Sequence, residues 1–169
     1  SVPALAALLG DPQLSNLARY ALEPMPFPEA GAALRAALGT TSGALQAGVA
    51  TSLGVRRDAE AAPLLAPLMA GADAVVAEAA TAALGRIATK ESLKALQGAA
   101  KEAAPERRAV LGEALLCLAD TWAAEKKGKA AAEVFEGLLG AEWPDHIRLG
   151  AFRGRTLARP KDAPKRLLA

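Results

Sequence analysis

Apolar and polar positions recur along the chain with a spacing of 31 residues. Counted from Asp11, apolar or small residues follow at positions 3, 6, 7, 10 and 11, which together form one face of an α-helix. The same positions are apolar or small when counted from Ser42 and Asp73, and the copy counted from Ala104 departs only at position 3. A fifth copy begins at Pro144 after a step of 40 residues and fits at positions 3, 6, 7 and 10. The pattern predicts five equivalent helices.

A second apolar segment precedes each of these helices. Leucine pairs mark it in the first four units, and Val134 with Leu138 marks it in the fifth. Stretches rich in Gly, Pro, Ser and Thr separate the segments, as expected of helix breakers. The chain therefore predicts a single all-α domain over 1–169, an α-α superhelix of about five antiparallel helix pairs. The predicted repeats are 1–27, 28–57, 58–88, 89–127 and 128–159, with the start of a further helix in 160–169.

Several residues predict where the helices begin. Asp11, Ser42 and Asp73 are good N-caps, because their side-chain oxygens can accept hydrogen bonds from free N–H groups of the first turn. Pro12 and Pro105 are expected at the first helical position, where a missing N–H costs nothing.

Composition supports a helical, closely packed molecule. The chain has 44 Ala and 26 Leu but only 16 β-branched residues, which excludes a fold dominated by strands. A hydrophobic content of 52% excludes intrinsic disorder. With six aromatic residues, the helices must pack through small side chains in a thin, elongated stack. No apolar run reaches the roughly 20 residues of a membrane span. The expected close-packing positions are Gly48, Gly54, Ala79, Ala80, Ala83, Gly85, Gly150, Ala151 and Gly154.

Paired helices at this spacing, together with specific sequence stretches, resemble a known family. The stretches are Val2-Pro3-Ala4-Leu5, Ala80-Thr81-Ala82-Ala83-Leu84-Gly85-Arg86-Ile87 and Asp145-His146-Ile147-Arg148. They are similar to HEAT-like repeats of the short phycobilisome-lyase type, because the ordinary HEAT unit is longer, at roughly 40–47 residues. The stretch 128–135 also resembles a tetratricopeptide helix, which is a local alternative at the fourth-to-fifth junction.

Two other stretches resemble HEAT segments of large multidomain proteins from planctomycetes and verrucomicrobia. They are residues 17–26 (LARYALEPMP) and 52–58 (SLGVRRD). The resemblance implies a parent protein that is often exported, so the location is expected to be extracytoplasmic, with a cytoplasmic one as the alternative. It implies no haem role, because the chain has no Cys-x-x-Cys-His motif. Both ends lack the polar faces of capping repeats, so we expect an excised piece of a longer chain.

The sequence offers little for catalysis. His146 is the only imidazole, Cys117 is about 29 residues away on another predicted helix, and no nucleophile or phosphate-binding motif is present. Cys117 is expected to be inert core, and His146 to be a surface or capping residue. Glu142, Asp145 and His146 lack the ligand spacing of a helical metal site. We therefore expect no enzyme activity and no cofactor or metal.

A binding surface is the better expectation. In a solenoid the second helices of each pair usually line the concave face, and positions 4, 5, 8 and 9 point away from the stripe assigned to the core. They form a mixed ribbon suited to a protein or peptide. The candidate partner-binding residues are Asn16, Arg19, Tyr20, Gln46, Thr51, Glu78, Thr81, Arg108, Glu113, Arg148 and Phe152. Arg19 and Glu23 are also spaced to pair with each other.

Charge is concentrated near the C-terminus. Arg148, Arg155 and Arg159 share one helical stripe with Phe152, which suggests an anion or nucleic-acid contact. The alternative is that these arginines pair with carboxylates of a following repeat. The chain's net charge of +2 is small for a nucleic-acid domain, so nucleic acid is a disfavoured partner.

Three functions remain open from the sequence: a protein-interaction scaffold, a passive spacer between domains, and an anion-binding module. Leu167 and Leu168 also predict a weak end-to-end contact between copies of the chain, because nothing obvious covers them. We expect the C-terminal repeat to be the weakest part of the fold for the same reason.

Overall fold

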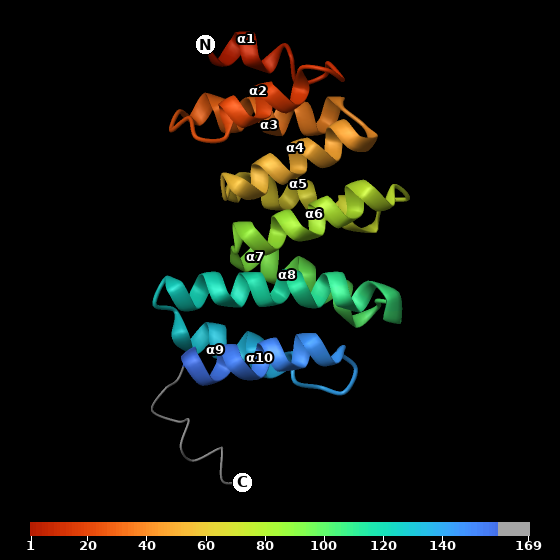
Figure 1. The fold of residues 1–169 in the computed structure, drawn as a ribbon, viewed down its shortest axis with the longest axis vertical. Helices are drawn as coiled ribbons and strands as arrows, with labels where there is room; N and C mark the ends of the chain where they lie inside the picture. The colour runs from red at the N-terminus through yellow and green to blue at the C-terminus, as the bar shows by residue number, and fades with distance from the viewer. Residues whose placement is uncertain (159–169) are drawn as a thin grey trace.

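The computed structural model describes residues 1–158, and their helices stack one above another along the long axis of the molecule (Figure 1). Every regular element of this part is helical, which confirms the predicted all-α superhelix. Helix α1 (Val2–Ala6) lies at one end and α10 (Asp145–Ala158) at the other. Within residues 1–158, no helix has both the length and the hydropathy needed to cross a membrane. Residues 160–169, where a further helix was predicted, lie outside the described part.

The helices alternate as first and second members of pairs. Besides α1, the first helices are α3 (Pro28–Thr40), α5 (Ala62–Leu65), α7 (Lys90–Lys101) and α9 (Gly128–Gly137). The second helices are α2 (Ser15–Leu22), α4 (Gly43–Val55), α6 (Ala74–Ile87), α8 (Pro105–Ala124) and α10. Each second helix packs directly on the next, so they form a continuous column through the stack. The proposed assignment of pairs to repeats stays a prediction.

Two of the predicted positions hold the core of this column. Position 7 is filled by small or branched residues with at most 1% exposure, and position 11 by leucines with at most 3%. They are Ala18, Val49, Ala80, Leu111, Leu22, Leu53, Leu84 and Leu115. Positions 3 and 6 were also expected in the core, and in α2 this was wrong. Leu14 is 40% and Leu17 66% exposed, because no second helix precedes α2 in the described chain.

Close backbone approach between second helices occurs at the expected glycines. A Cβ on Gly54 of α4 would lie 2.8 Å from the Cα of Ala83 on α6. A Cβ on Gly85 of α6 would lie 2.6 Å from the carbonyl oxygen of Ala114 on α8. The contact recurs 31 residues on, and it explains why glycine occupies this column.

Helix starts follow the sequence only in part. Asp73 caps α6, and its Oδ1 accepts from the N–H groups two and three residues on, at 3.0 and 3.2 Å. Pro105 is the first residue of α8. Asp11 makes the same kind of bonds, but α2 begins only at Ser15, so Pro12 lies in a turn. Ser42 stands at the N-cap of α4 without a side-chain cap bond, which corrects that prediction.

The first helix of the third pair is interrupted. It divides into a 3-10 turn at Ala59–Ala61, the short α5 and a second 3-10 turn at Pro67–Ala70. Pro63 and Pro67 cause the division, because neither can donate the N–H that a continuous helix requires. Leu65 is nevertheless fully buried, so the segment still covers the second helices.

The long helix α8 ties the fourth pair to the third. Its Trp122, only 6% exposed, donates from Nε1 to the carbonyl oxygen of Ala88 at 2.6 Å. Ala88 ends α6 in the left-handed region, with φ of 55°. A left-handed residue commonly terminates a helix and leaves carbonyls free for such a bond.

Candidate functional site

Half of the predicted binding ribbon belongs to the core. Position 8, predicted to face a partner, is buried in three of the five second helices, at Ala50, Thr81 and Gly112. Thr81 is 1% exposed, and its hydroxyl donates to the Ala77 carbonyl at 2.7 Å. Thr81 is therefore a packing residue and not a partner contact. The error arises because small residues at this position let the next helix approach and cover it.

Arg19 occupies position 8 of α2 and is used inside the fold. Its Nη1 donates to the Gly48 carbonyl at 3.0 Å and to the Ser52 hydroxyl at 3.3 Å. The Ser52 hydroxyl in turn donates to Glu23 Oε1 at 2.7 Å. The expected Arg19–Glu23 pair is thus bridged by Ser52 of the next second helix. A Cβ at residue 48 would lie 2.6 Å from the guanidinium carbon, so glycine makes room for the arginine.

Three further candidates are half-buried and satisfied by nearby backbone. Gln46 Nε2 donates to the Leu38 carbonyl at 2.9 Å, which joins α4 to α3. The Thr51 hydroxyl donates to the carbonyl four residues earlier at 3.0 Å. Arg108 Nη1 donates to the Glu142 carbonyl at 3.1 Å, reaching the loop before α10. Gln46 and Arg108 hold neighbouring segments together, and Thr51 leaves part of its side chain open.

The remaining candidates are exposed and follow positions 5 and 9 of successive second helices. Asn16 and Tyr20 lie on α2, Glu78 on α6 and Glu113 on α8, and all four are exposed. Tyr20 is 59% exposed, which is unusual for so large an aromatic side chain. With Thr51 they make a row across four consecutive second helices. We name Asn16, Tyr20, Thr51, Glu78 and Glu113 the second-helix ridge.

A shallow groove runs beside the ridge, between the first halves of α6 and α8. Its walls include Glu78 of the ridge, Ala77 and Val110, and Thr81 lies on its floor. Arg107 closes one end and donates from Nη2 to the Met69 carbonyl at 2.6 Å. The structure therefore brings Glu78 and Thr81 together, as a wall and a floor of one groove.

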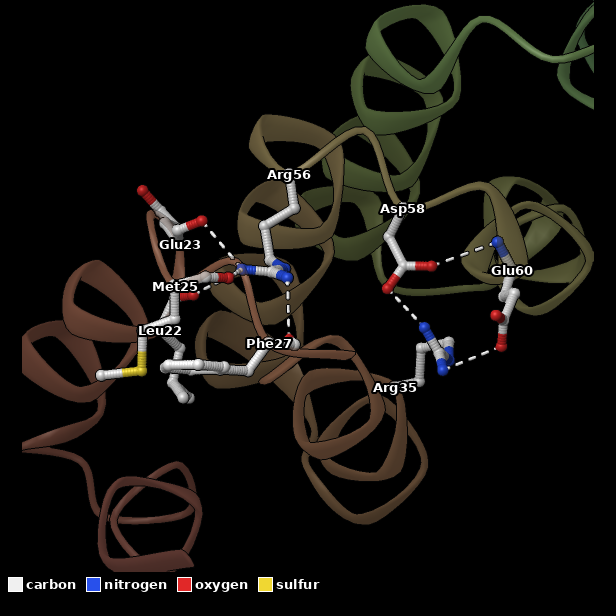
Figure 2. Close-up of polar contacts among 8 residues, drawn as sticks. All are labelled: Leu22, Glu23, Met25, Phe27, Arg35, Arg56, Asp58 and Glu60. Carbon is white, nitrogen blue, oxygen red and sulfur yellow. Dashed lines mark hydrogen bonds and ion pairs between the residues drawn. The ribbon is translucent and has the colours of Figure 1, made fainter. Parts of the chain in front are cut away.

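Arg56 joins the two stretches that distinguished the chain at the sequence level (Figure 2). It directly follows α4, and its Nη1 donates to the carbonyls of Leu22, Glu23 and Met25 at 2.7, 2.9 and 2.7 Å. These carbonyls lie at the end of α2 and in the linker after it, where a cation is favoured by the helix dipole. The sequence pattern showed both stretches but not their contact.

A second cluster lies close by (Figure 2). Asp58 accepts from Arg35 Nη1 at 2.5 Å and caps the turn at 59–61 through the N–H of Glu60 at 3.1 Å. Arg35 also reaches Glu60 Oε2 at 2.9 Å. Like Arg56, these residues tie the second pair to the third pair, and their role is structural.

The C-terminal arginines do not form an open basic stripe. Arg155 is paired with Glu136 Oε2 at 2.6 Å, and its side chain is only 15% exposed. Arg148 pairs with Asp145 Oδ1 at 2.9 Å. Arg159 lies outside the described residues. Arg155 was expected to contact an anion, and this expectation is corrected because a carboxylate of its own repeat already holds it. Phe152 is 44% exposed, with the Arg155 guanidinium 5.8 Å from its ring centroid.

The described residues hold no arrangement typical of catalysis. No group of His, Cys, Asp and Glu within residues 1–158 could hold a metal ion. Burial raises the pKa of the half-buried Cys117 thiol, which works against a reactive thiolate. His146 is exposed, with its Nε2 3.7 Å from Glu113 Oε1 on the neighbouring second helix.

Comparison with known proteins agrees with this geometry. A family model described as HEAT repeats matches residues 31–116, which is half of the chain. Searches of curated proteins and of solved structures gave no match. HEAT repeats commonly mediate protein–protein interaction or scaffolding and are typically not enzymes. The matched segment contains α4, α6 and most of α3, and it carries the repeated glycine contacts. The chain belongs to the HEAT-repeat family.

Proposed function

We propose that the chain is a non-enzymatic scaffold whose second-helix ridge binds a protein or peptide. The carrying observation is the row of exposed side chains at equivalent positions of α2, α6 and α8, next to positions that are all buried. Stacked repeats expose one equivalent strip per unit, and such strips form the extended binding surfaces of solenoid proteins. The residues of the ridge come from separate repeats, so a partner would contact several units at once.

The chemistry of the ridge favours a protein over a polyanion. Tyr20 supplies a large, rigid side chain of the type enriched at binding hot spots. Glu78 and Glu113 add negative charge, which would repel a nucleic-acid backbone. The groove beside Glu78 offers apolar walls from Ala77 and Val110. We therefore expect a partner segment with an apolar side chain for the groove and a basic residue beside Glu78.

The test is affinity capture from a lysate of the source organism with three versions of the full chain. The ridge variant carries Tyr20→Ala and Glu78→Ala. The control variant carries Glu91→Ala and Lys94→Ala on the exposed side of α7, a first helix. Quantitative mass spectrometry compares what each version retains.

The scaffold proposal expects at least one protein that wild type and control retain equally and that the ridge variant loses by about tenfold or more, equivalent to ~1.4 kcal/mol. Equal retention by all three versions would place the contact elsewhere. If no version retains any protein, the passive spacer becomes the better explanation.

A further inference from the structure

The second helices contact one another through a repeated pair of faces. Position 8 of one helix meets position 6 of the next at the first interface, where Arg19 lies on Gly48. Position 12 meets position 10 at the third, where Gly85 lies on Ala114. At the last interface, position 8 is still in contact, with Gly112 against Ile147. Each second helix therefore has one face for the helix before it and another for the helix after it.

The first of these faces is open at the N-terminal end of the stack. Leu14 and Leu17 occupy positions 3 and 6 of α2 and are 40% and 66% exposed. At position 6 the four later second helices are half-buried under their predecessors. These residues are Gly48, Ala79, Val110 and Gly150. We name Leu14 and Leu17 the N-terminal end face.

The second face is open at α10. Phe152 is at position 8, which is buried in α4, α6 and α8, yet it is 44% exposed. Leu149 on the same helix is 69% exposed. Together with Leu139, Asp145 and Arg148 they line an apolar hollow, which we name the C-terminal end face.

We propose that these two end faces are the two halves of one interface, through which a second copy of this chain docks head to tail. The contact would continue the series of interfaces between second helices, with Leu17 of one copy entering the hollow beside Phe152 and Leu149 of the other. The N-terminal end face brings no charge to this contact. The charged pair in the hollow, Asp145 and Arg148, is already joined at 2.9 Å, so docking would leave no charge unpaired.

The geometry also sets the kind of assembly. The two faces are different surfaces on one chain, so the contact is heterologous, and every docked copy leaves one free end of each kind. Association therefore adds copies in a row instead of stopping at a symmetric dimer. This proposal uses neither the second-helix ridge nor its partner.

Sedimentation equilibrium of the full chain tests the proposal, because it reports the average mass from micromolar to millimolar concentration. The N-end variant is Leu17→Glu and the C-end variant is Leu149→Glu, both at strongly exposed leucines. Val75→Glu is the control, because Val75 is 60% exposed on α6 in the middle of the stack. Circular dichroism checks that all versions are folded, and Leu14→Glu or Phe152→Glu replaces a variant that is not.

The mass of wild type and control is expected to rise with concentration beyond that of two copies. Each end variant alone should stay monomeric, because one half of its interface is blocked. An equimolar mixture of the two should form a complex of two chains and no larger, joined through the two intact ends. A monomeric wild type at all concentrations, an end variant that still associates alone, or a mixture that stays monomeric would each overturn the proposal.

Discussion

Gly85 of α6 lies so close to Ala114 of α8 that a Cβ on Gly85 would fall 2.6 Å from the Ala114 carbonyl oxygen and 2.9 Å from its Cα. Gly54 stands in a similar relation to Ala83 at the preceding interface. In both pairs the obstacle is backbone, which cannot rotate away as a long side chain could. These contacts set the distance between neighbouring second helices.

Replacing Gly85 by Ala should therefore separate α6 from α8 and lower the free energy of unfolding by ~1–3 kcal/mol, the usual cost of overpacking. Urea unfolding measures the change. The matched control is Gly98→Ala on α7, where an added Cβ meets nothing within 4 Å. That control should gain up to ~1 kcal/mol from the better helix propensity of alanine. A Gly85→Ala protein as stable as the control would contradict the close approach.

Ala80→Leu probes the buried face of α6 in the same way. Ala80 is fully buried at position 7, so three extra heavy atoms have no space, and we expect a loss of ~1–3 kcal/mol. Ala82→Leu, two residues on and exposed, should leave the thermal melt nearly unchanged. Equal melts for both variants would mean that the face of α6 is wrongly assigned.

Arg56→Ala should weaken the junction between the first two pairs. The substitution removes the donor shared by the carbonyls of Leu22, Glu23 and Met25, and leaving such acceptors unsatisfied costs ~1–3 kcal/mol. Arg86→Ala, at an exposed arginine in the last turn of α6, is the control. Chemical denaturation should show a clear loss for Arg56→Ala only. A comparable loss in the control would point to a general effect of charge.

Glu125 should make stability depend on pH. Hydrogen bonds from Lys127 and Arg57 hold its pKa below the ordinary value of a glutamate. A lowered pKa in the folded state stabilises the fold at pH values above the unfolded pKa, and this contribution is lost as the pH falls through the folded pKa. Wild type should therefore melt at a higher temperature than Glu125→Gln at neutral pH, and the difference should vanish in acid.

The same difference should shrink in high salt, because Glu125 and its partners are solvent-accessible and salt screens such pairs. Glu78→Gln, an equal change of charge on α6, is the control. A melting difference for Glu125→Gln that depends on neither pH nor salt would show that the ion cluster does not contribute.

The repeat spacing made much of the fold predictable. The column of Leu22, Leu53, Leu84 and Leu115 is one period of the sequence and also one line of buried leucines in the structure. Asp73 caps its helix as its position suggests. These features depend on local chemistry and on a regular period, and both can be read along the chain.

The candidate site was less predictable because it depends on how helices rotate against one another. Thr81 is polar enough for a surface, yet α8 covers it, and Arg19 is drawn into the space left by Gly48. Contacts such as Trp122 with the Ala88 carbonyl link residues 34 apart in sequence. A pattern of single positions does not contain these pairings.

Amide hydrogen exchange on the dilute, monomeric chain tests the central claim most directly. If the molecule is a stack in which each pair is held by its neighbours, protection must depend on the number of neighbours. The account predicts the slowest exchange in α6, which packs on α4 and α8, and faster exchange towards both ends, in α1 and in α10. Equal protection of 145–158 and α6 would contradict it, because the terminal pair would then be a true cap.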